Sequence, residues 1–73
     1  MRLPLISSQE LIKALGRIGY SPARQKGSHI RLICSGKLPI TVPNYDLLDR
    51  SLLKMILREA NLSSDDLLNL LEN

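Results

Sequence analysis

The sequence predicts an α+β fold in which helices cover one face of a three-stranded antiparallel sheet. Apolar residues recur at helical spacing before residue 19 and again after residue 50, and they alternate with other residues between positions 29 and 42. A chain of 73 residues has room for one small core, so residues 1–73 are expected to form a single domain.

The first helix is expected from about Ser8 to Ile18. Ser7 is a favourable N-cap, and Glu10 lies three residues after it, which is the spacing of a capping box. Gly19 follows the apolar pattern, and a glycine there can adopt the positive φ that ends many helices. The buried face of this helix is expected to contain Leu11, Ala14, Leu15 and Ile18.

The middle of the chain predicts three strands joined by two turns. A strand around Arg24 is expected near a sheet edge, because Pro22 has no N–H group to donate. Turn sequences follow at residues 27–28 and 35–37. The alternate positions His29 and Arg31 are expected on the open face of the sheet. The positions expected to face the helices are Ile30, Leu32, Cys34, Ile40 and Val42.

Two more helices are expected in the last third of the chain. Either Asp49 or Ser51 could be the N-cap of the first, and Asn61 suits the left-handed residue that ends it. Ser63, with Asp66 three residues later, predicts the start of a short last helix. The apolar stripe of the first of these helices contains Leu52, Leu53, Ile56, Leu57 and Ala60.

The charges are unevenly distributed along the chain. Residues 1–45 carry seven cations and one anion, whereas residues 46–73 carry three cations and six anions, for a net charge of +3. No acidic residue occurs from Leu11 to Tyr45. This asymmetry indicates an anionic partner, of which a phosphodiester backbone is the commonest. The alternative is a solvated basic face.

The composition excludes several classes of protein and site. No apolar run is long enough for a membrane span, and the N-terminal apolar stretch is too short for a signal peptide. Cys34 is the only cysteine, so we expect a reducing cytoplasm and read Cys34 as a small core residue. One cysteine and one histidine cannot supply a zinc ligand set, and no cofactor is expected.

His29 is the only histidine, and it lies among cations. Imidazole is the side chain best suited to exchange protons near neutral pH. Metal-free RNA cleavage needs such a base, together with cations that stabilise a pentacovalent phosphorane. The residues that could supply this set are His29 for proton transfer, with Arg24, Lys26 and Arg31 for the phosphates.

Each of these assignments has a structural alternative. His29 could be an exposed strand residue with no task. Gly27 could let the backbone approach a phosphate and the Ser28 hydroxyl could bind it, but both are also ordinary turn residues. Tyr20 and Tyr45 are expected to be half-buried packing residues rather than base-stacking platforms, although Tyr45 could lie near the site.

Four blocks of the sequence, SSQELIKALGRIGY, RQKGSH, ITVPN and ILREANLS, span nearly the whole chain. In order and spacing they resemble the HicA (YcfA-like) toxins of type II toxin–antitoxin systems, and RQKGSH is the most specific block. The resemblance implies a double-stranded-RNA-binding-like α-β-β-β-α fold and cleavage of mRNA without a metal ion. It also implies neutralisation by a HicB-type antitoxin that covers the active site.

The resemblance also implies roles for individual residues. The histidine of the family's Gly-Ser-His motif is catalytic, which implies this role for His29, after Gly27 and Ser28. The basic positions of the motif are Arg24 and Lys26.

The chain departs from the family's pattern just after the last strand. Tyr45 stands where many members carry a second histidine, and residues 51–53 are Ser-Leu-Leu instead of Gly-Thr-Leu. Nothing in the sequence resembles a base-reading pocket, so no RNA sequence preference is predicted.

Three hypotheses of function follow. The first is a cytoplasmic toxin that cleaves mRNA through His29 and is inhibited by a HicB-type antitoxin. The second is a non-catalytic RNA-binding module of the same fold, in which His29 is one more RNA contact. The third is a small interaction subunit whose basic face meets an acidic protein. All three are compatible with an antitoxin partner, and none involves a membrane.

Overall fold

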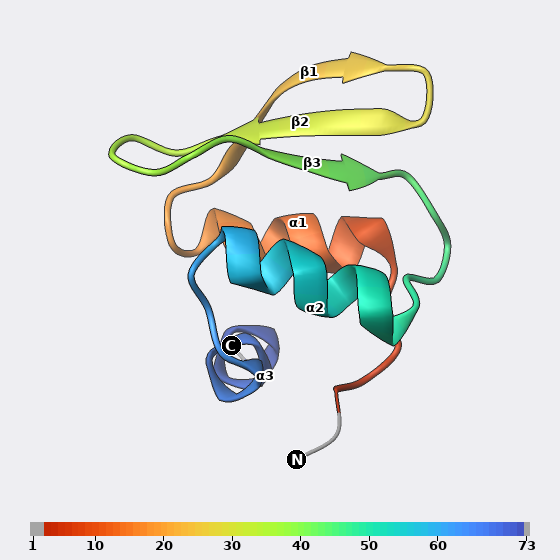
Figure 1. The fold of residues 1–73 in the computed structure, drawn as a ribbon, viewed down its shortest axis with the longest axis vertical. Coiled ribbons are helices and arrows are strands. Elements are labelled where there is room, and N and C mark those ends of the chain that lie inside the picture. Colours follow the sequence, from red (N-terminus) through yellow and green to blue (C-terminus); the bar gives the residue numbers. More distant parts are fainter. Residues whose placement is uncertain (1–2, 73) are drawn as a thin grey trace.

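The computed structural model describes residues 3–72, so Arg2, one of the cations counted above, lies outside the described residues. The elements are α1 (Ser8–Gly16), β1 (Ser21–Lys26), β2 (His29–Ile33), β3 (Ile40–Pro43), α2 (Arg50–Glu59) and α3 (Ser64–Glu72). The three strands form one antiparallel sheet in the order β1-β2-β3. Helices α1 and α2 lie under one face of the sheet, and α3 lies farther from it (Figure 1). The predicted α+β fold is confirmed.

The core lies between the sheet and the two helices beneath it. The sheet contributes four of the five residues predicted to face the helices: Ile30 and Leu32 from β2 and Ile40 and Val42 from β3, all at most 5% exposed. The helices contribute wholly buried side chains such as Leu11, Leu15, Leu53 and Ile56. Burying a side chain of this size stabilises the folded state by about 1.5–3 kcal/mol, so this layer dominates the stability.

Strand β1 lies beyond this packed layer. All six of its residues are exposed, and only β2 pairs with it. Its pairing is interrupted by a bulge between Pro22 and Arg24, consistent with the edge position predicted from the proline. The hairpin of β1 and β2 therefore carries its outer strand into solvent.

The first helix begins as predicted but ends earlier. Ser7 and Glu10 form the capping box, since the Glu10 N–H donates to Ser7 Oγ at 3.1 Å and the Ser7 N–H donates to Glu10 Oε1 at 3.0 Å. Helix α1 ends at Gly16 rather than Ile18, because the next amide groups switch to carbonyls three residues back: the Arg17 N–H donates to Ala14. This tighter turn leads to Gly19, which has the expected positive φ of 105°.

The caps of the last two helices also follow the sequence. Asp49 is the N-cap of α2 and accepts a hydrogen bond from the Leu52 N–H at 2.8 Å, which decides between the two predicted candidates. Asn61 has a φ of 61°, as expected for a left-handed residue after the helix. Ser63 and Asp66 form reciprocal hydrogen bonds at the start of α3, at 3.0 and 2.9 Å. Hydrogen bonding by Ser63, first by its backbone N–H and then by its side chain, lowers the pKa of the Asp66 carboxyl below its ordinary value.

Candidate functional site

The strand register brings four of the predicted site residues onto the open face of the sheet. Lys26 of β1 pairs with His29 of β2, and Arg24 pairs with Arg31. Because Ile30 faces the helices, its neighbours in β2 point to the opposite face, and residues directly across the ladder share that face. All four side chains are exposed. The structure therefore gathers an imidazole and three cations in one place.

The electrostatics of this face are unfavourable for the isolated chain. Arg24 and Arg31 are directly opposite each other, an arrangement of like charges that destabilises a sheet. On its other side Arg31 donates a hydrogen bond to Thr41 Oγ1 at 3.2 Å, and His29 pairs with Pro43. None of these cross-strand neighbours carries a negative charge, so an anion that approaches the face would relieve the repulsion.

The turn beside His29 depends on glycine for a conformational reason. Gly27 and Ser28 form the two-residue turn between the paired residues Lys26 and His29. Gly27 has a φ of 60°, which is the glycine-first geometry of a type II′ hairpin turn. A Cβ at Gly27 would meet no heavy atom within 4 Å, so the positive φ and not lack of space favours glycine. The sequence alone supplied the turn residues but not this distinction.

The chain after β3 lies against this turn. The Asn44 N–H donates to the Ser28 carbonyl oxygen at 2.6 Å. The next residue, Tyr45, is 51% exposed, so about half of its surface is buried, as predicted, and the other half faces solvent. The backbone of Tyr45 makes the hydrogen bonds that hold the loop against α1. Tyr20, in contrast, is only 3% exposed, and its hydroxyl donates to the Leu38 carbonyl at 3.1 Å.

Ser8 is a structural residue that the sequence did not reveal. It is wholly buried at the start of α1, where its Oγ donates to the Pro43 carbonyl and accepts from the Tyr45 N–H at 2.8 Å. Its own N–H donates to the Tyr45 carbonyl at 3.0 Å. These bonds join α1 to the end of β3 at Pro43, which pairs with His29, and at Tyr45. A second serine after an N-cap serine carries no signal for such a role in a single sequence.

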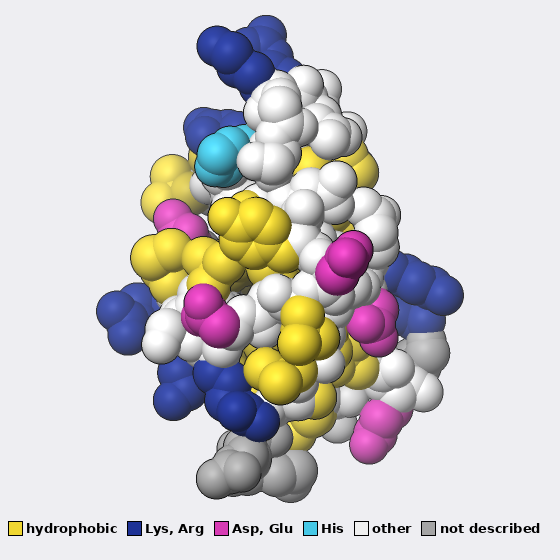
Figure 2. Space-filling model, turned by 90° about the vertical axis from the view of Figure 1, so that its right-hand side faces the viewer, with side chains coloured by type: hydrophobic (Ala, Val, Ile, Leu, Met, Phe, Trp, Pro, Cys, Tyr) yellow, Lys and Arg dark blue, Asp and Glu magenta, His cyan; other side chains and the backbone are white. Residues whose placement is uncertain are grey.

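A side view of the surface shows which kinds of side chain surround His29. Figure 2 shows the histidine toward one end of the molecule, with Lys and Arg side chains beside it and hydrophobic side chains below it. The predicted core residue Cys34 is only partly buried and lies just past β2, where its Sγ is 3.7 Å from the Ile18 carbonyl oxygen. It therefore packs at the edge of the core, away from the open face.

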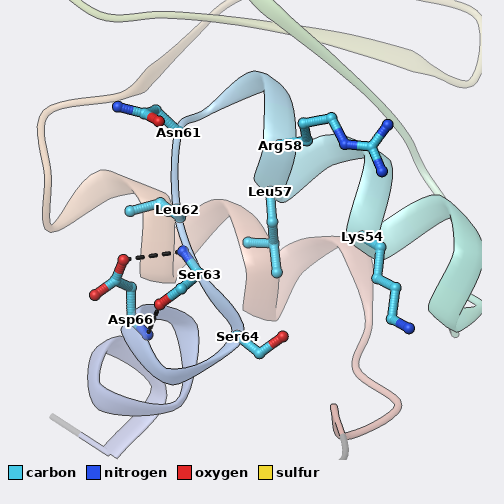
Figure 3. Close-up of a pocket in the computed structure, with 8 residues that line it drawn as sticks. All are labelled: Lys54, Leu57, Arg58, Asn61, Leu62, Ser63, Ser64 and Asp66. Carbon is cyan, nitrogen blue, oxygen red and sulfur yellow. Dashed lines mark hydrogen bonds between the residues drawn. The ribbon is translucent and has the colours of Figure 1, made fainter.

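A separate hollow lies where α2 meets α3 (Figure 3). Its cations Lys54 and Arg58 come from α2, and none of its lining residues belongs to the sheet. Its polar groups at the start of α3 are already used, because Ser63 and Asp66 bond to each other in the helix cap. We therefore assign the candidate site to the open face of the sheet.

Residues 3–72 have two features that concern metals and membranes. No three histidine, cysteine or acidic side chains in this range form a group that could hold a metal ion. Within the same range, no helix has the length and apolarity needed to cross a bilayer.

Comparison with known proteins identifies the family. The family described as HicA toxin of bacterial toxin-antitoxin matches residues 8–62, from α1 to the residue after Asn61. The chain belongs to the HicA toxin family. The match includes the whole open face and the loop after β3, whereas α3 lies beyond it. The predicted resemblance to HicA toxins of toxin–antitoxin systems is confirmed.

A solved structure agrees with this assignment. A chain of a structure titled "Toxin-Antitoxin complex from Streptococcus pneumoniae" aligns with this HicA toxin with a TM-score of 0.71 and 31% sequence identity. The alignment covers 78% of this chain and 98% of that chain. No curated protein matched the sequence.

Proposed function

We propose that this HicA toxin is a metal-independent endoribonuclease that cleaves mRNA, with His29 as its catalytic residue. The observation that carries the proposal is the grouping of His29 with Lys26, Arg24 and Arg31 on the open face. A face with one imidazole and three cations, two of them opposed, is suited to a phosphodiester that carries its own negative charge.

The proposed reaction needs one proton acceptor and stabilised phosphate oxygens. His29 accepts the proton of a 2′-hydroxyl, and the 2′-oxygen attacks the adjacent phosphorus. The bond from phosphorus to the 5′-oxygen breaks, leaving a 2′,3′-cyclic phosphate. The departing 5′-oxygen takes a proton from solvent, because the chain has no second imidazole. A modest rate is expected from a single-histidine site.

The other residues of the site would bind the backbone. Lys26 lies directly across the ladder from His29, so its ammonium group is suited to the scissile phosphate. Arg24 and Arg31 lie one pair farther along and would hold a neighbouring phosphate, where an anion between them removes their repulsion. Gly27 keeps the turn next to His29 free of a side chain, and the exposed Ser28 can donate its hydroxyl to a phosphate oxygen.

We further propose a HicB-type antitoxin as the protein partner, in the cytoplasm, where mRNA is met. The support is the family and the aligned structure, whose title names a toxin–antitoxin complex. An acidic antitoxin surface would complement the exposed cations of the open face. Such a partner would inhibit cleavage by covering His29.

The test compares induction of the wild-type chain with induction of His29→Ala in the same bacterial host, following growth and full-length mRNA together. Arrest with mRNA loss in the wild type, and neither in a folded His29→Ala protein, is the expected result. Equal arrest by both proteins would favour the non-catalytic RNA-binding module.

A second experiment addresses the metal. Purified toxin should cleave RNA in excess chelator as fast as without chelator. Loss of cleavage in chelator would reject the metal-independent mechanism.

A further inference from the structure

Tyr45 is the exposed aromatic residue of this protein. The chain has two tyrosines and neither tryptophan nor phenylalanine, and Tyr20 is buried. Tyr45 exposes 51% of its surface on the loop that follows β3. About half of the surface of Tyr45 is therefore free to contact a partner.

The backbone of Tyr45 lies near the end of the open face that carries His29. Pro43 pairs with His29 across the ladder, and the Asn44 N–H bonds to the Ser28 carbonyl oxygen at 2.6 Å. Tyr45 follows directly. The aromatic side chain thus projects from a segment that contacts the turn before His29, and Figure 2 shows hydrophobic side chains next to the histidine.

The backbone under this ring is held firmly. The Tyr45 N–H lies 2.8 Å from Ser8 Oγ and 3.1 Å from the Pro43 carbonyl oxygen, and the Tyr45 carbonyl accepts from the Ser8 N–H at 3.0 Å. Ser8 is wholly buried at the start of α1. A ring on a fixed backbone loses little conformational entropy on binding, which favours a stacking contact.

We infer that Tyr45 stacks on a nucleobase of the RNA, next to the phosphate that lies at His29. This inference rests on the proposed function, adds a residue to its substrate site, and replaces the expectation from the sequence that Tyr45 does not stack on bases. Single-stranded nucleic acids are bound by cationic surfaces that track the phosphates together with aromatic rings that stack on the bases. Here the aromatic residue follows directly on Asn44, which bonds to the turn before His29. Every base has a π-face, so this contact accepts any sequence and needs no base-reading pocket.

The test measures binding without turnover. The probe is a mixed-sequence 2′-O-methyl RNA of about eight nucleotides, within the usual site sizes, and the same backbone made with abasic residues. Methylation blocks attack by the 2′-oxygen, so affinity is read alone. The variants are Tyr45→Leu and Tyr45→Phe, with Leu38→Ala as the matched control, because Leu38 is 77% exposed on the loop between β2 and β3.

We expect the loss of the Tyr45 ring to weaken binding of the base-containing probe only. Tyr45→Leu should bind the base-containing probe about 5- to 150-fold more weakly, the equivalent of about 1–3 kcal/mol per stacked base. Tyr45→Phe and Leu38→Ala should bind it like the wild type, and all four proteins should bind the abasic probe alike. Unchanged binding of the base-containing probe by Tyr45→Leu, or an equal loss on both probes, would overturn the inference. Unchanged binding would favour contact of the Tyr45 ring with a protein partner instead of with RNA.

A cleavage assay distinguishes failure of this inference from failure of the proposed function. Unmodified RNA of the same sequence is offered to wild type, His29→Ala and Tyr45→Leu. If cleavage requires His29 but Tyr45→Leu binds the probe normally, only the stacking inference fails. If binding requires Tyr45 but the wild type cleaves nothing, the stacking inference stands and the proposed endonuclease fails.

Discussion

The two faces of the sheet are made by the same strands but have opposite chemistry. On the helix-covered face, Ile30, Leu32 and Val42 are buried in an apolar layer. On the open face, the alternate residues of β2, His29 and Arg31, lie in solvent beside the cations of β1. The side-chain alternation of a strand thus assigns stability to one face and the proposed chemistry to the other. Substitutions on the two faces should therefore change different measurements.

The largest effect is expected from His29→Ala on the open face. Removing a general base should reduce single-turnover RNA cleavage by about 10²- to 10⁴-fold. The free energy of unfolding should change by no more than about 0.5 kcal/mol, as is usual for substitutions of exposed residues, so the melting temperature should change little. Cleavage assays and thermal unfolding of the same preparation check both halves. A large drop in stability would show that His29 belongs to the structural part of the molecule.

Leu32→Ala tests the opposite face. Leu32 is wholly buried next to Arg31, so truncation should cost about 2–5 kcal/mol in the free energy of unfolding through lost burial and a cavity. Denaturant unfolding measures this loss. Leu38→Ala is the control, because Leu38 is 77% exposed and its truncation should change stability by less than about 0.5 kcal/mol. Similar losses for the two variants would contradict the assigned core.

Ser8→Ala should reduce both stability and RNA binding, unlike substitutions on either face of the sheet. The substitution leaves the Pro43 carbonyl and the Tyr45 N–H without the hydroxyl that now bonds both, at a cost of about 1–3 kcal/mol. It should also weaken binding of base-containing RNA, because the backbone of Tyr45 loses a bond. Unfolding and probe binding are measured together, with the exposed Ser35→Ala as control. A loss of stability alone would show that the ring does not depend on this support.

Arg24→Gln should change the two measurements in opposite directions. Removing one of two facing charges should stabilise the chain by up to about 1 kcal/mol at low salt, while RNA binding weakens. Arg17→Gln, on the turn after α1, removes the same charge away from the open face. It should produce a smaller gain in stability and a smaller loss of RNA binding than Arg24→Gln. A destabilised Arg24→Gln protein would mean that the opposed arginines do not repel each other in the folded chain.

The smallest effect is expected at the start of α3, far from both faces. The hydrogen bonds from Ser63 lower the pKa of Asp66 in the folded chain, so the ionised form stabilises the fold above the ordinary pKa of 3.8. This contribution is lost as the pH falls through the lowered value. Asp66→Asn should therefore unfold with a weaker acid dependence than Asp65→Asn. Identical acid unfolding of the two variants would contradict this role.

Local features of the fold could be predicted from the sequence, and distant contacts could not. The capping box at Ser7, the positive φ of Gly19 and the cap at Asn61 each depend on residues a few positions apart. The open-face set around His29 was also predictable, because two strands joined by a two-residue turn fix their own register. The burial of Ser8 depends on partners 35 and 37 residues away, and nothing local in the sequence reveals such contacts.

The long-range support of Tyr45 could not be predicted from the sequence either. The backbone of Tyr45 is held by bonds to Ser8, which lies 37 residues away and which no local pattern connects with this loop. Cys34 differs for a simpler reason. Strand β2 ends at Ile33, so the alternation that predicted a buried Cys34 no longer applies fully at that position.

The edge position of β1 has a consequence for solubility. An unpaired strand edge offers free backbone groups to other chains, and proteins guard such edges with proline, bulges and charge. Strand β1 has all three: Pro22, the bulge after it, and the cations Arg24 and Lys26. The same charges that attract a phosphate therefore keep one copy of the chain from adding its strand to another. Neutralising them, whether by substitution or by a bound polyanion, removes part of that guard and exposes the hairpin to edge-to-edge aggregation.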